Sequence, residues 1–543
     1  MALAALFTVA WTIRDRANLA VLRLPDTDDV VRLQQVRDWL GGQGWRDLVQ
    51  HRLGIDGVPM HWTRLADLGP GGLIALLTPL VGRHAAELSA VIAWPAILFA
   101  AALVLTARIA RRLDAPPATA QLVAALGFPV SAMFLPGRID HHGLQLVLLL
   151  AMVAAALAPP RAVTGGAIAL AATASLVVGM ETAPFVALAV GLVVANWATG
   201  RPGAARQLAG LGAALLGGLL LAAVVFAPAA WTYPACDGFT RQVWAAGLVG
   251  GVTLLMLAGI GRNMMSGWPH VLLTEAVGGV AAVVALALAP GCVDPYGGVD
   301  AAVAARWLRH VGEAQSPFAA SLATVVGQCG LMLAGIAATA WLLMTRRHVG
   351  WGILLAFQLG ALAIALVQLR GANAGALLAA PALAATIAAA RTRGTIALTA
   401  AWAGSAGILY PLAAQALLTS AGAPEPPDCA SPAVLAALDR LPPGRIAGPV
   451  DLGAWGIAAT HHRFLAAPYH RNRGNAAAFA ILDGPAARAL TVARATRTDY
   501  LAICGPGPGW IMHDRPRWLH AVLTIDGFVL YRIDRLPEPV VPT

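Results

Sequence analysis

The chain has 543 residues, of which 58% are hydrophobic and 12% are charged, and its mean hydropathy is +0.69. A water-soluble globular protein cannot bury so much apolar surface, so the composition predicts a chain whose solvent is the lipid bilayer. The formal net charge of +10 does not indicate nucleic-acid binding, because the arginines cluster in short connections between apolar runs instead of forming one basic face.

Apolar runs long enough to cross about 30 Å of hydrocarbon recur through the first 420 residues, and in lipid such runs must be helices. The first run, from Met1 to about Ile13, has no basic residue ahead of it and no clear cleavage site, which predicts an uncleaved span instead of a signal peptide. With it, the expected fold is an α-helical polytopic membrane protein of about thirteen transmembrane helices. The later spans are expected at residues 86–107, 116–135, 143–158, 164–180, 183–199, 208–230, 242–260, 270–289, 318–344, 350–368, 373–390 and 395–418.

The connections between these spans fall into two alternating sets. One set is rich in arginine, which the positive-inside rule assigns to the cytoplasm; its members are Arg108, Arg111, Arg112, Arg161, Arg201, Arg206, Arg262, Arg346, Arg347, Arg391 and Arg393. The other set faces outward and holds most of the acidic residues and histidines. It comprises a first loop at 14–70, a turn at 136–142, the Tyr233–Trp244 loop, a long loop at 290–317 and the tail after 420.

The first outward loop begins with Asp26-Thr27-Asp28-Asp29. Three carboxylates within four residues repel one another unless a cation or arginines lie between them. A solvated turn or a helix N-cap is the alternative interpretation of this run.

The second outward turn carries Asp140-His141-His142 between two apolar spans. Carboxylate oxygen and imidazole nitrogen two residues apart suit Mn²⁺ or Mg²⁺, with waters completing the coordination shell. Ionisable residues at the membrane edge are candidate functional residues, although a polar cap that keeps the helix end in water is the alternative.

Glu313 lies in Val311-Gly312-Glu313-Ala314-Gln315, just before the span expected at 318–344. Alone, it is typical of an interfacial polar residue. We treat Glu313 as a candidate functional residue because it falls on the same outward face as the other two motifs.

These three motifs, in this order and in these loops, resemble the catalytic subunit of the oligosaccharyltransferases, which are glycosyltransferases of the GT-C superfamily with thirteen spans and an outer soluble domain. The resemblance covers roughly the first 390 residues. It implies that Asp28, Asp140, His142 and Glu313 bind one divalent cation and that Glu313 also contacts the acceptor. We expect the cation to be Mn²⁺ or Mg²⁺ and Asp26 or Asp28 to act as base toward the acceptor. It also implies that Arg370 contacts the phosphate of a lipid-linked donor, with plain interfacial anchoring as the alternative, and that Asp29, Arg37 and His141 surround the site.

The tail departs from this family, because it lacks the Trp-Trp-Asp triplet with which those enzymes bind the Ser or Thr of the acceptor sequon. Its nearest segments contain Asp451, followed by His470 and Arg471, which are candidates for binding an acceptor or equally for a solvated surface. Short apolar strands at Arg445–Val450, Tyr500–Cys504 and Phe528–Ile533, with helical stretches at 432–440 and 484–496, predict a small α/β domain.

Four of the five cysteines, Cys236, Cys292, Cys429 and Cys504, lie in outward segments. An oxidising compartment permits disulfides among them, but the sequence does not define the pairing, and unpaired structural cysteines are the alternative.

The sequence therefore predicts a transmembrane catalytic domain at 1–419 and a soluble extracytoplasmic domain at 420–543. The expected function is an inverting, metal-dependent glycosyltransferase of a bacterial inner membrane, with its site facing the periplasm. It would transfer a sugar or oligosaccharide from a polyprenyl phosphate or diphosphate donor to a protein, glycan or lipid acceptor. A GT-C enzyme of polysaccharide or lipid glycosylation is an alternative, and so is a transporter, although a transporter places its ionisable residues at the membrane midplane.

Overall fold

The computed structural model describes the chain except residues 233–234, 294–298, 419–427, 515 and 535–543. Eight of the described helices are long and apolar enough to cross a bilayer, which makes the protein a multi-pass membrane protein. They are α4 (Arg64–Val81), α5 (Arg83–Arg112), α10 (Ala204–Phe226), α11 (Arg241–Ile260, continued by the 3₁₀ turn η2, Gly261–Asn263), α12 (Trp268–Leu288), α14 (Leu322–Arg346), α15 (Val349–Val367) and α16 (Gly371–Ala390, continued by η5, Arg391–Arg393).

A ninth span is formed if α17 (Thr395–Ser405) and α18 (Leu409–Leu418), which are bent by 84° at their junction, count as one. Four shorter apolar helices complete the bundle: α1 (Ala2–Arg14), α7 (His141–Ala156), α8 (Ala162–Val178) and α9 (Ala183–Ala198). The helical membrane architecture is thus confirmed, whereas the number thirteen stays a prediction.

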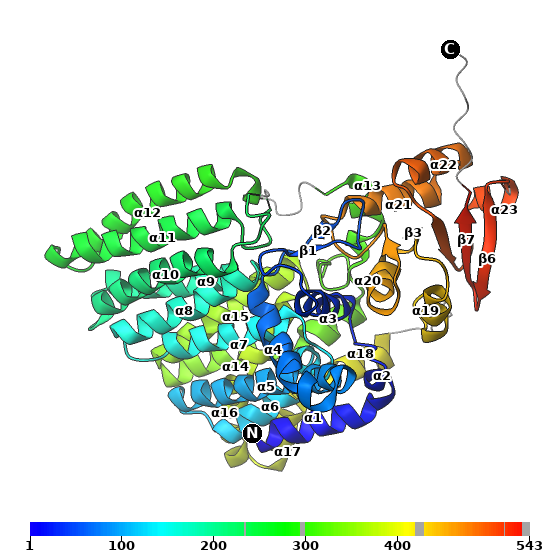
Figure 1. The fold of residues 1–543 in the computed structure, drawn as a ribbon. Coiled ribbons are helices and arrows are strands. Elements are labelled where there is room, and N and C mark those ends of the chain that lie inside the picture. Colours follow the sequence, from blue (N-terminus) through cyan, green and yellow to red (C-terminus); the bar gives the residue numbers. More distant parts are fainter. Residues whose placement is uncertain (233–234, 294–298, 419–427, 515, 535–543) are drawn as a thin grey trace.

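Close helix contact in the bundle depends on glycine. A Cβ on Gly165 of α8 would lie 2.0 Å from the carbonyl oxygen of Gln207 in α10, and one on Gly210 would lie 2.3 Å from the carbonyl oxygen of Ala162. Figure 1 shows α10, α11 and α12 following one another toward one edge of the bundle. The outermost of them, α12, has no buried residue in its most apolar 18-residue stretch, as expected for a lipid-facing helix.

The structure differs from the sequence prediction at 116–135, where one continuous span was expected. Helix α6 (Pro117–Ala125) ends early, and the chain resumes as the 3₁₀ helix η1 (Val130–Phe134). The break lies at Pro129, which lacks an N–H and whose ring disfavours a helical residue before it. Helix α4 also begins inside the predicted polar loop 14–70, capped by the Thr63 hydroxyl, and in Figure 1 it runs steeply across the ends of the bundle helices.

One end of the bundle, here called the loop end, carries the outward loops of the sequence prediction. It contains α2 (Arg16–Ala20), α3 (Thr27–Leu40), the hairpin of β1 (Val49–Gln50) and β2 (Val58–Pro59), and the short helices η3 (Pro290–Val293), α13 (Ala301–Arg306) and η4 (Leu308–His310). Helix α3 begins where Asp26 accepts a hydrogen bond from the Asp28 backbone N–H, so that the N-cap interpretation holds for Asp26.

The tail folds as the predicted α/β unit. Its sheet has the order β4-β3-β5-β7-β6, in which β3 is parallel to β4 and β5, and β7 is antiparallel to β5 and β6. The elements are α19 (Pro432–Asp439), β3 (Arg445–Ala447), α20 (Val450–Ala459), β4 (Arg463–Phe464), α21 (Arg473–Asp483), α22 (Ala486–Ala495), β5 (Tyr500–Cys504), α23 (Gly509–Asp514), β6 (Leu519–Ile525) and β7 (Phe528–Ile533). A disulfide joins Cys429 to Cys504 at the end of β5.

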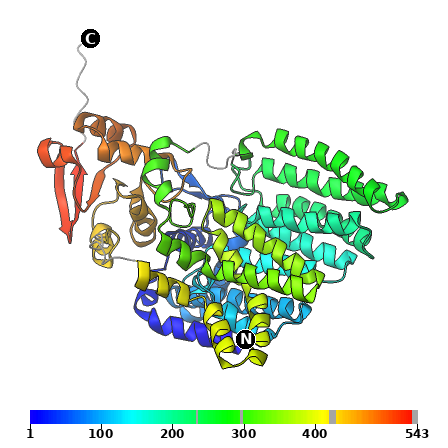
Figure 2. The same ribbon diagram turned by 180° about the vertical axis from the view of Figure 1, so that it is seen from behind.

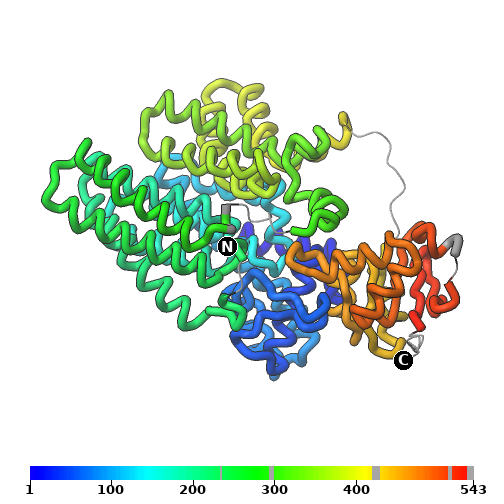
Figure 3. Tube along the Cα trace, turned by 90° about the horizontal axis from the view of Figure 1, so that it is seen from above, coloured from blue at the N-terminus to red at the C-terminus, as the bar shows by residue number. Residues whose placement is uncertain are grey.

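The first loop docks this unit onto the loop end. The backbone of Gly54 donates to the carbonyl of Phe464 at 2.8 Å, and Phe464 donates to the carbonyl of Arg52 at 2.8 Å, so the loop covers the β4 edge of the sheet. Leu53 and Phe464 share one buried hydrophobic cluster with Trp62. Figures 2 and 3 show the strands beside the bundle, with the N-terminal segments between them.

Candidate functional site

Four acidic residues at the loop end, Asp26, Asp28, Asp29 and Asp140, form what we call the acidic cluster, and Arg138 lies in its centre. The guanidinium contacts Asp26 at 2.8 Å, Asp29 at 3.2 Å and Asp140 at 2.7 Å, and only 7% of the Arg138 side chain is exposed. Asp29 also accepts the backbone N–H of Asp140 at 2.8 Å, which joins the start of α3 to the start of α7. The first two sequence motifs therefore meet.

Asp28 lies in the cluster without contacting Arg138 in any ion pair of the described residues. Its pKa is raised to about 7, first by burial and then by the carboxylates of Asp26, Asp140 and Glu313, while His142 acts in the opposite direction. By contrast, burial alone would raise the pKa of Asp140, but Arg138, the two neighbouring histidines and Arg32 together hold it below its usual value. Negative charge around Asp28 is thus left incompletely compensated.

His142 lies in the first turn of α7 and lines an open pocket of about 510 Å³ together with Glu313 and Arg370. Leu146 and Leu149 follow His142 at one-turn intervals on the same face of α7 and line the same pocket. The wall therefore changes from charged at the loop end to apolar toward the bundle interior.

The third motif and the predicted phosphate-binding arginine contact each other. The Arg370 guanidinium lies 3.3 Å from Glu313, and the Arg370 backbone N–H donates to the Glu313 carbonyl at 3.0 Å. The Leu369 N–H donates to the Gln315 carbonyl at 2.8 Å, which fixes this loop against the start of α16. Glu313 and Arg370 thus reach the pocket as a pair.

A second group of ligating side chains, His61, His141 and Glu181, has its ligand atoms within 4.8 Å of one another. His141 contacts Glu181 through Nε2 at 3.0 Å and Arg32 through Nδ1 at 3.1 Å. Arginine can only donate, so Nδ1 of His141 accepts and Nε2 carries the proton that Glu181 accepts. A metal-bound His141 needs the opposite arrangement, with its free ring nitrogen donating outward. This group therefore fits a hydrogen-bonded support better than a metal site.

Asp28, Asp140, His142 and Glu313 interact electrostatically with one another. Within the described residues, however, their ligand atoms do not form a group as compact as that of His61, His141 and Glu181. Three carboxylates and one imidazole are a donor set that suits Mn²⁺ or Mg²⁺. Burial, and after it the nearby carboxylates, raise the pKa of Asp28, and a cation would compensate these carboxylates.

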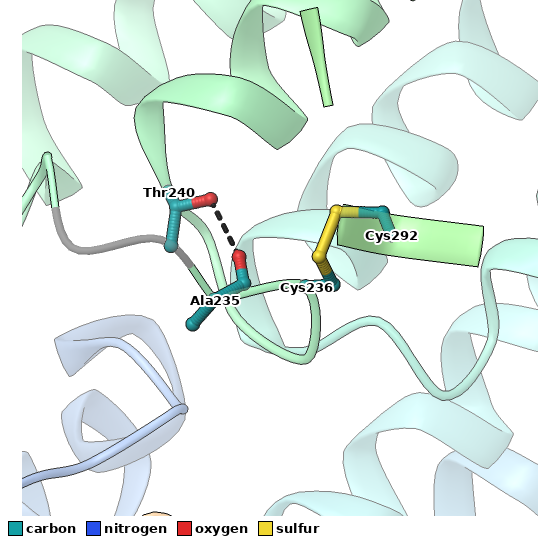
Figure 4. Close-up of a disulfide and its surroundings, with 4 residues drawn as sticks. All are labelled: Ala235, Cys236, Thr240 and Cys292. Atoms are coloured by element: carbon teal, nitrogen blue, oxygen red, sulfur yellow. Dashed lines mark hydrogen bonds between the residues drawn. A yellow bond between two sulfur atoms is a disulfide. The ribbon is translucent and has the colours of Figure 1, made fainter. Parts of the chain in front are cut away.

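A loop held by a disulfide joins the bundle to the C-terminal unit. Cys236 is bonded to Cys292, and the Thr240 hydroxyl donates to the Ala235 carbonyl at 2.9 Å (Figure 4). Asp237 of this loop contacts His470 at 3.0 Å and Arg471 at 3.3 Å. Burial would raise the pKa of Asp237, but His470 and Arg471 hold it below its usual value. The two tail candidates thus bind a loop carboxylate instead of forming a solvated surface.

Two further predicted residues, Arg37 and Asp451, lie outside the cluster. Arg37 forms a two-point ion pair with Glu87, at 2.7 and 3.0 Å, and donates to the Ala458 carbonyl at 3.2 Å, so it joins α3 to α5 and α20. Asp451 lies in the first turn of α20, and partial burial and the nearby Asp26 carboxylate raise its pKa.

Sequence reasoning missed several residues of the site: Arg138, Glu181, His61, Asp237 and Tyr469. Arg138 was detectable, because it lies two residues from Asp140 in an outward turn. Glu181 is a single acid at the end of an apolar run, which marks a candidate at the membrane edge. His61, Asp237 and Tyr469 carry no local signal.

No family model and no curated protein matches the chain. Among solved structures, it is similar to the oligosaccharyltransferase AglB of Archaeoglobus fulgidus. The apo form is 14% identical with a TM-score of 0.63, covering 92% of this chain and 69% of that one. The complex with an inhibitory peptide and a dolichol-phosphate is 12% identical with a TM-score of 0.64, covering 98% and 75%. The complex with Zn and sulfate is 13% identical with a TM-score of 0.58, covering 92% and 67%. The chain has the fold of that enzyme.

Proposed function

We propose that the protein is an inverting, metal-dependent glycosyltransferase that transfers a sugar or oligosaccharide from a polyprenyl phosphate or diphosphate donor. One observation supports this most: a single pocket holds His142, Glu313 and Arg370 at one end and apolar side chains of α7 at the other. An anionic head with a lipid tail matches that gradient. In the AglB complex, a protein of the same fold binds a dolichol-phosphate, which has an anionic head and a lipid tail.

In this proposal the donor enters from the bilayer, and its phosphate binds Arg370 while its lipid remains in hydrocarbon. Asp28, Asp140, His142 and Glu313 would hold the divalent cation, which would supply positive charge to offset the charge on the departing phosphate. Asp26 or Asp28 accepts the proton of the acceptor nucleophile as it attacks the anomeric carbon from the opposite side. A single displacement of this kind inverts the configuration.

We place the site on the periplasmic face of a bacterial inner membrane. The arginine-rich connections support this orientation. Among the connections between the spans predicted from the sequence, they alternate with those that carry the acidic motifs, so the two sets lie on opposite sides of the membrane. The C-terminal α/β unit would then be extracytoplasmic, where its Cys429–Cys504 disulfide is stable.

The acceptor we favour is a glycan or lipid instead of an Asn-linked sequon. Asp451 is the second residue of α20 and follows Pro449 and Val450, so no tryptophan pair precedes it. A hydroxyl-bearing acceptor needs only a base and space beside Asp26. Protein glycosylation and transport remain the alternatives that the experiment must separate.

Transfer can be tested in proteoliposomes with a panel of radiolabelled polyprenyl phosphate and diphosphate sugars, with Mn²⁺ or with chelator. Labelled product with a new glycosidic bond, lost on chelation, supports the proposal. If label crosses sealed vesicles with its glycosidic bond intact, the transporter interpretation is correct. If transfer persists in chelator, the metal-dependent mechanism is wrong.

Replacing Arg370 by alanine is expected to raise KM for the lipid-linked donor by about 10- to 100-fold with a smaller change in kcat. A charged hydrogen bond to phosphate contributes about 1.5–3 kcal/mol, and it is present in both the ground state and the transition state. Arg370→Lys, which keeps the charge, should retain an intermediate KM. An unchanged KM in Arg370→Ala would assign Arg370 to interfacial anchoring.

A further inference from the structure

Tyr469 extends from the C-terminal unit into the acidic cluster. Its hydroxyl donates to Oδ1 of Asp28 at 3.1 Å, although the two residues are 441 positions apart. The side chain is buried, and its ring packs edge-on against Trp62, with 5.8 Å between ring centroids. This is a direct polar contact between the C-terminal unit and a predicted cation ligand.

The chain on both sides of Tyr469 is fixed. Asn475 donates to the Tyr469 carbonyl at 3.1 Å and accepts the Ala467 backbone N–H at 2.9 Å. The next two residues, His470 and Arg471, contact Asp237 in the loop that the Cys236–Cys292 disulfide holds. We call the contacts of Asp237 with His470 and Arg471 the clamp. Tyr469 therefore presents its hydroxyl from a rigid support.

We propose that Tyr469 is a positioning residue for the cation of the proposed glycosyltransferase. Its hydroxyl binds one oxygen of Asp28 and so sets the rotation of the carboxylate, and the second oxygen would then be the one that binds a cation. The clamp holds the hydroxyl in place through the backbone of residues 469–471. The inference rests on the proposed function, because it assumes that Asp28 is a cation ligand.

Second-shell contacts of this kind change metal affinity by about 10- to 100-fold when they are removed. Tyr469→Phe removes the hydroxyl and keeps the ring against Trp62. We expect the dissociation constant for Mn²⁺, measured by electron paramagnetic resonance on the purified full-length protein without substrate, to rise by about 10- to 100-fold.

Tyr500→Phe is the matched control. Tyr500 is buried to the same extent, since 6% of each residue is exposed. Its hydroxyl also donates a hydrogen bond, to the Pro442 carbonyl at 3.0 Å within the C-terminal unit. This variant loses a buried tyrosine hydroxyl without touching the acidic cluster. We expect it to bind Mn²⁺ as the unchanged protein does, and a loss equal to that of Tyr469→Phe would overturn the inference.

The clamp is tested by Asp237→Asn, alone and combined with Tyr469→Phe. If the clamp acts through the hydroxyl, Asp237→Asn weakens Mn²⁺ binding alone and adds nothing in the Tyr469→Phe background. Fully additive effects would overturn the clamp's role.

The two proposals fail differently. Equal Mn²⁺ binding by Tyr469→Phe and the unchanged protein overturns the positioning role and leaves the glycosyltransferase proposal standing. If the unchanged protein does not bind Mn²⁺ at all, the metal site fails, and the positioning role fails with it.

Discussion

Asp28→Asn is expected to reduce sugar transfer by about 1,000-fold or more, because a cation that stabilises the leaving phosphate contributes several kcal/mol to the transition state. Asparagine keeps the shape of the side chain and an oxygen that can accept the Tyr469 hydroxyl, so the change removes mainly the charge. Initial rates in proteoliposomes at saturating donor and a series of Mn²⁺ concentrations measure the effect. The loss should not be recovered at high Mn²⁺.

Asp15→Asn is the matched control, since Asp15 pairs with Arg14 at the exposed end of α1, away from the pocket. Its transfer rate should equal that of the unchanged protein. Asp28→Asn should also remain folded in chelator, because Asp28 faces the repelling carboxylates of Asp26, Asp140 and Glu313. Transfer within tenfold of the unchanged rate would remove Asp28 from the cation site.

The fold was predictable where one physical effect dominates. Long apolar runs gave the positions of helices such as α10 and α14, since only a helix satisfies its backbone in lipid. Alternating arginine-rich connections predicted that Asp28 and Asp140 lie at the same end of the bundle, and the structure brings these two acids into one cluster. Strands β5 and β7 were predicted with their observed bounds, because their apolar runs are short and distinct.

Prediction failed where partners are distant in sequence. Nothing near Tyr469 indicates that it will contact Asp28, and nothing near Asp237 indicates His470, because tertiary packing alone creates these contacts. The pairing of Cys236 with Cys292 and of Cys429 with Cys504 was undetermined for the same reason. The alternatives for the Asp26–Asp29 run were not exclusive: Asp26 caps α3, while Asp28 faces Glu313 and His142.

Arg138→Met is expected to lower the free energy of unfolding by about 3–5 kcal/mol, since removing one partner of a buried ion pair leaves uncompensated charge. Here three carboxylates, Asp26, Asp29 and Asp140, would lose their shared guanidinium. Thermal unfolding in lipid nanodiscs with chelator measures the loss. Added Mn²⁺ should recover part of it, because a cation can compensate the same carboxylates.

Arg83→Met is the control for the loss of an arginine that pairs with an acid. Arg83 contacts Glu87 at 3.2 Å with 63% of its side chain exposed, and Arg37 still binds Glu87 when Arg83 is removed. An exposed pair contributes at most about 1 kcal/mol, so this variant should unfold almost as the unchanged protein does. If Arg138→Met were no less stable than Arg83→Met, then Asp29 and Asp140 would be taking up protons in place of the guanidinium. The acidic cluster would then not depend on Arg138 for its charge balance.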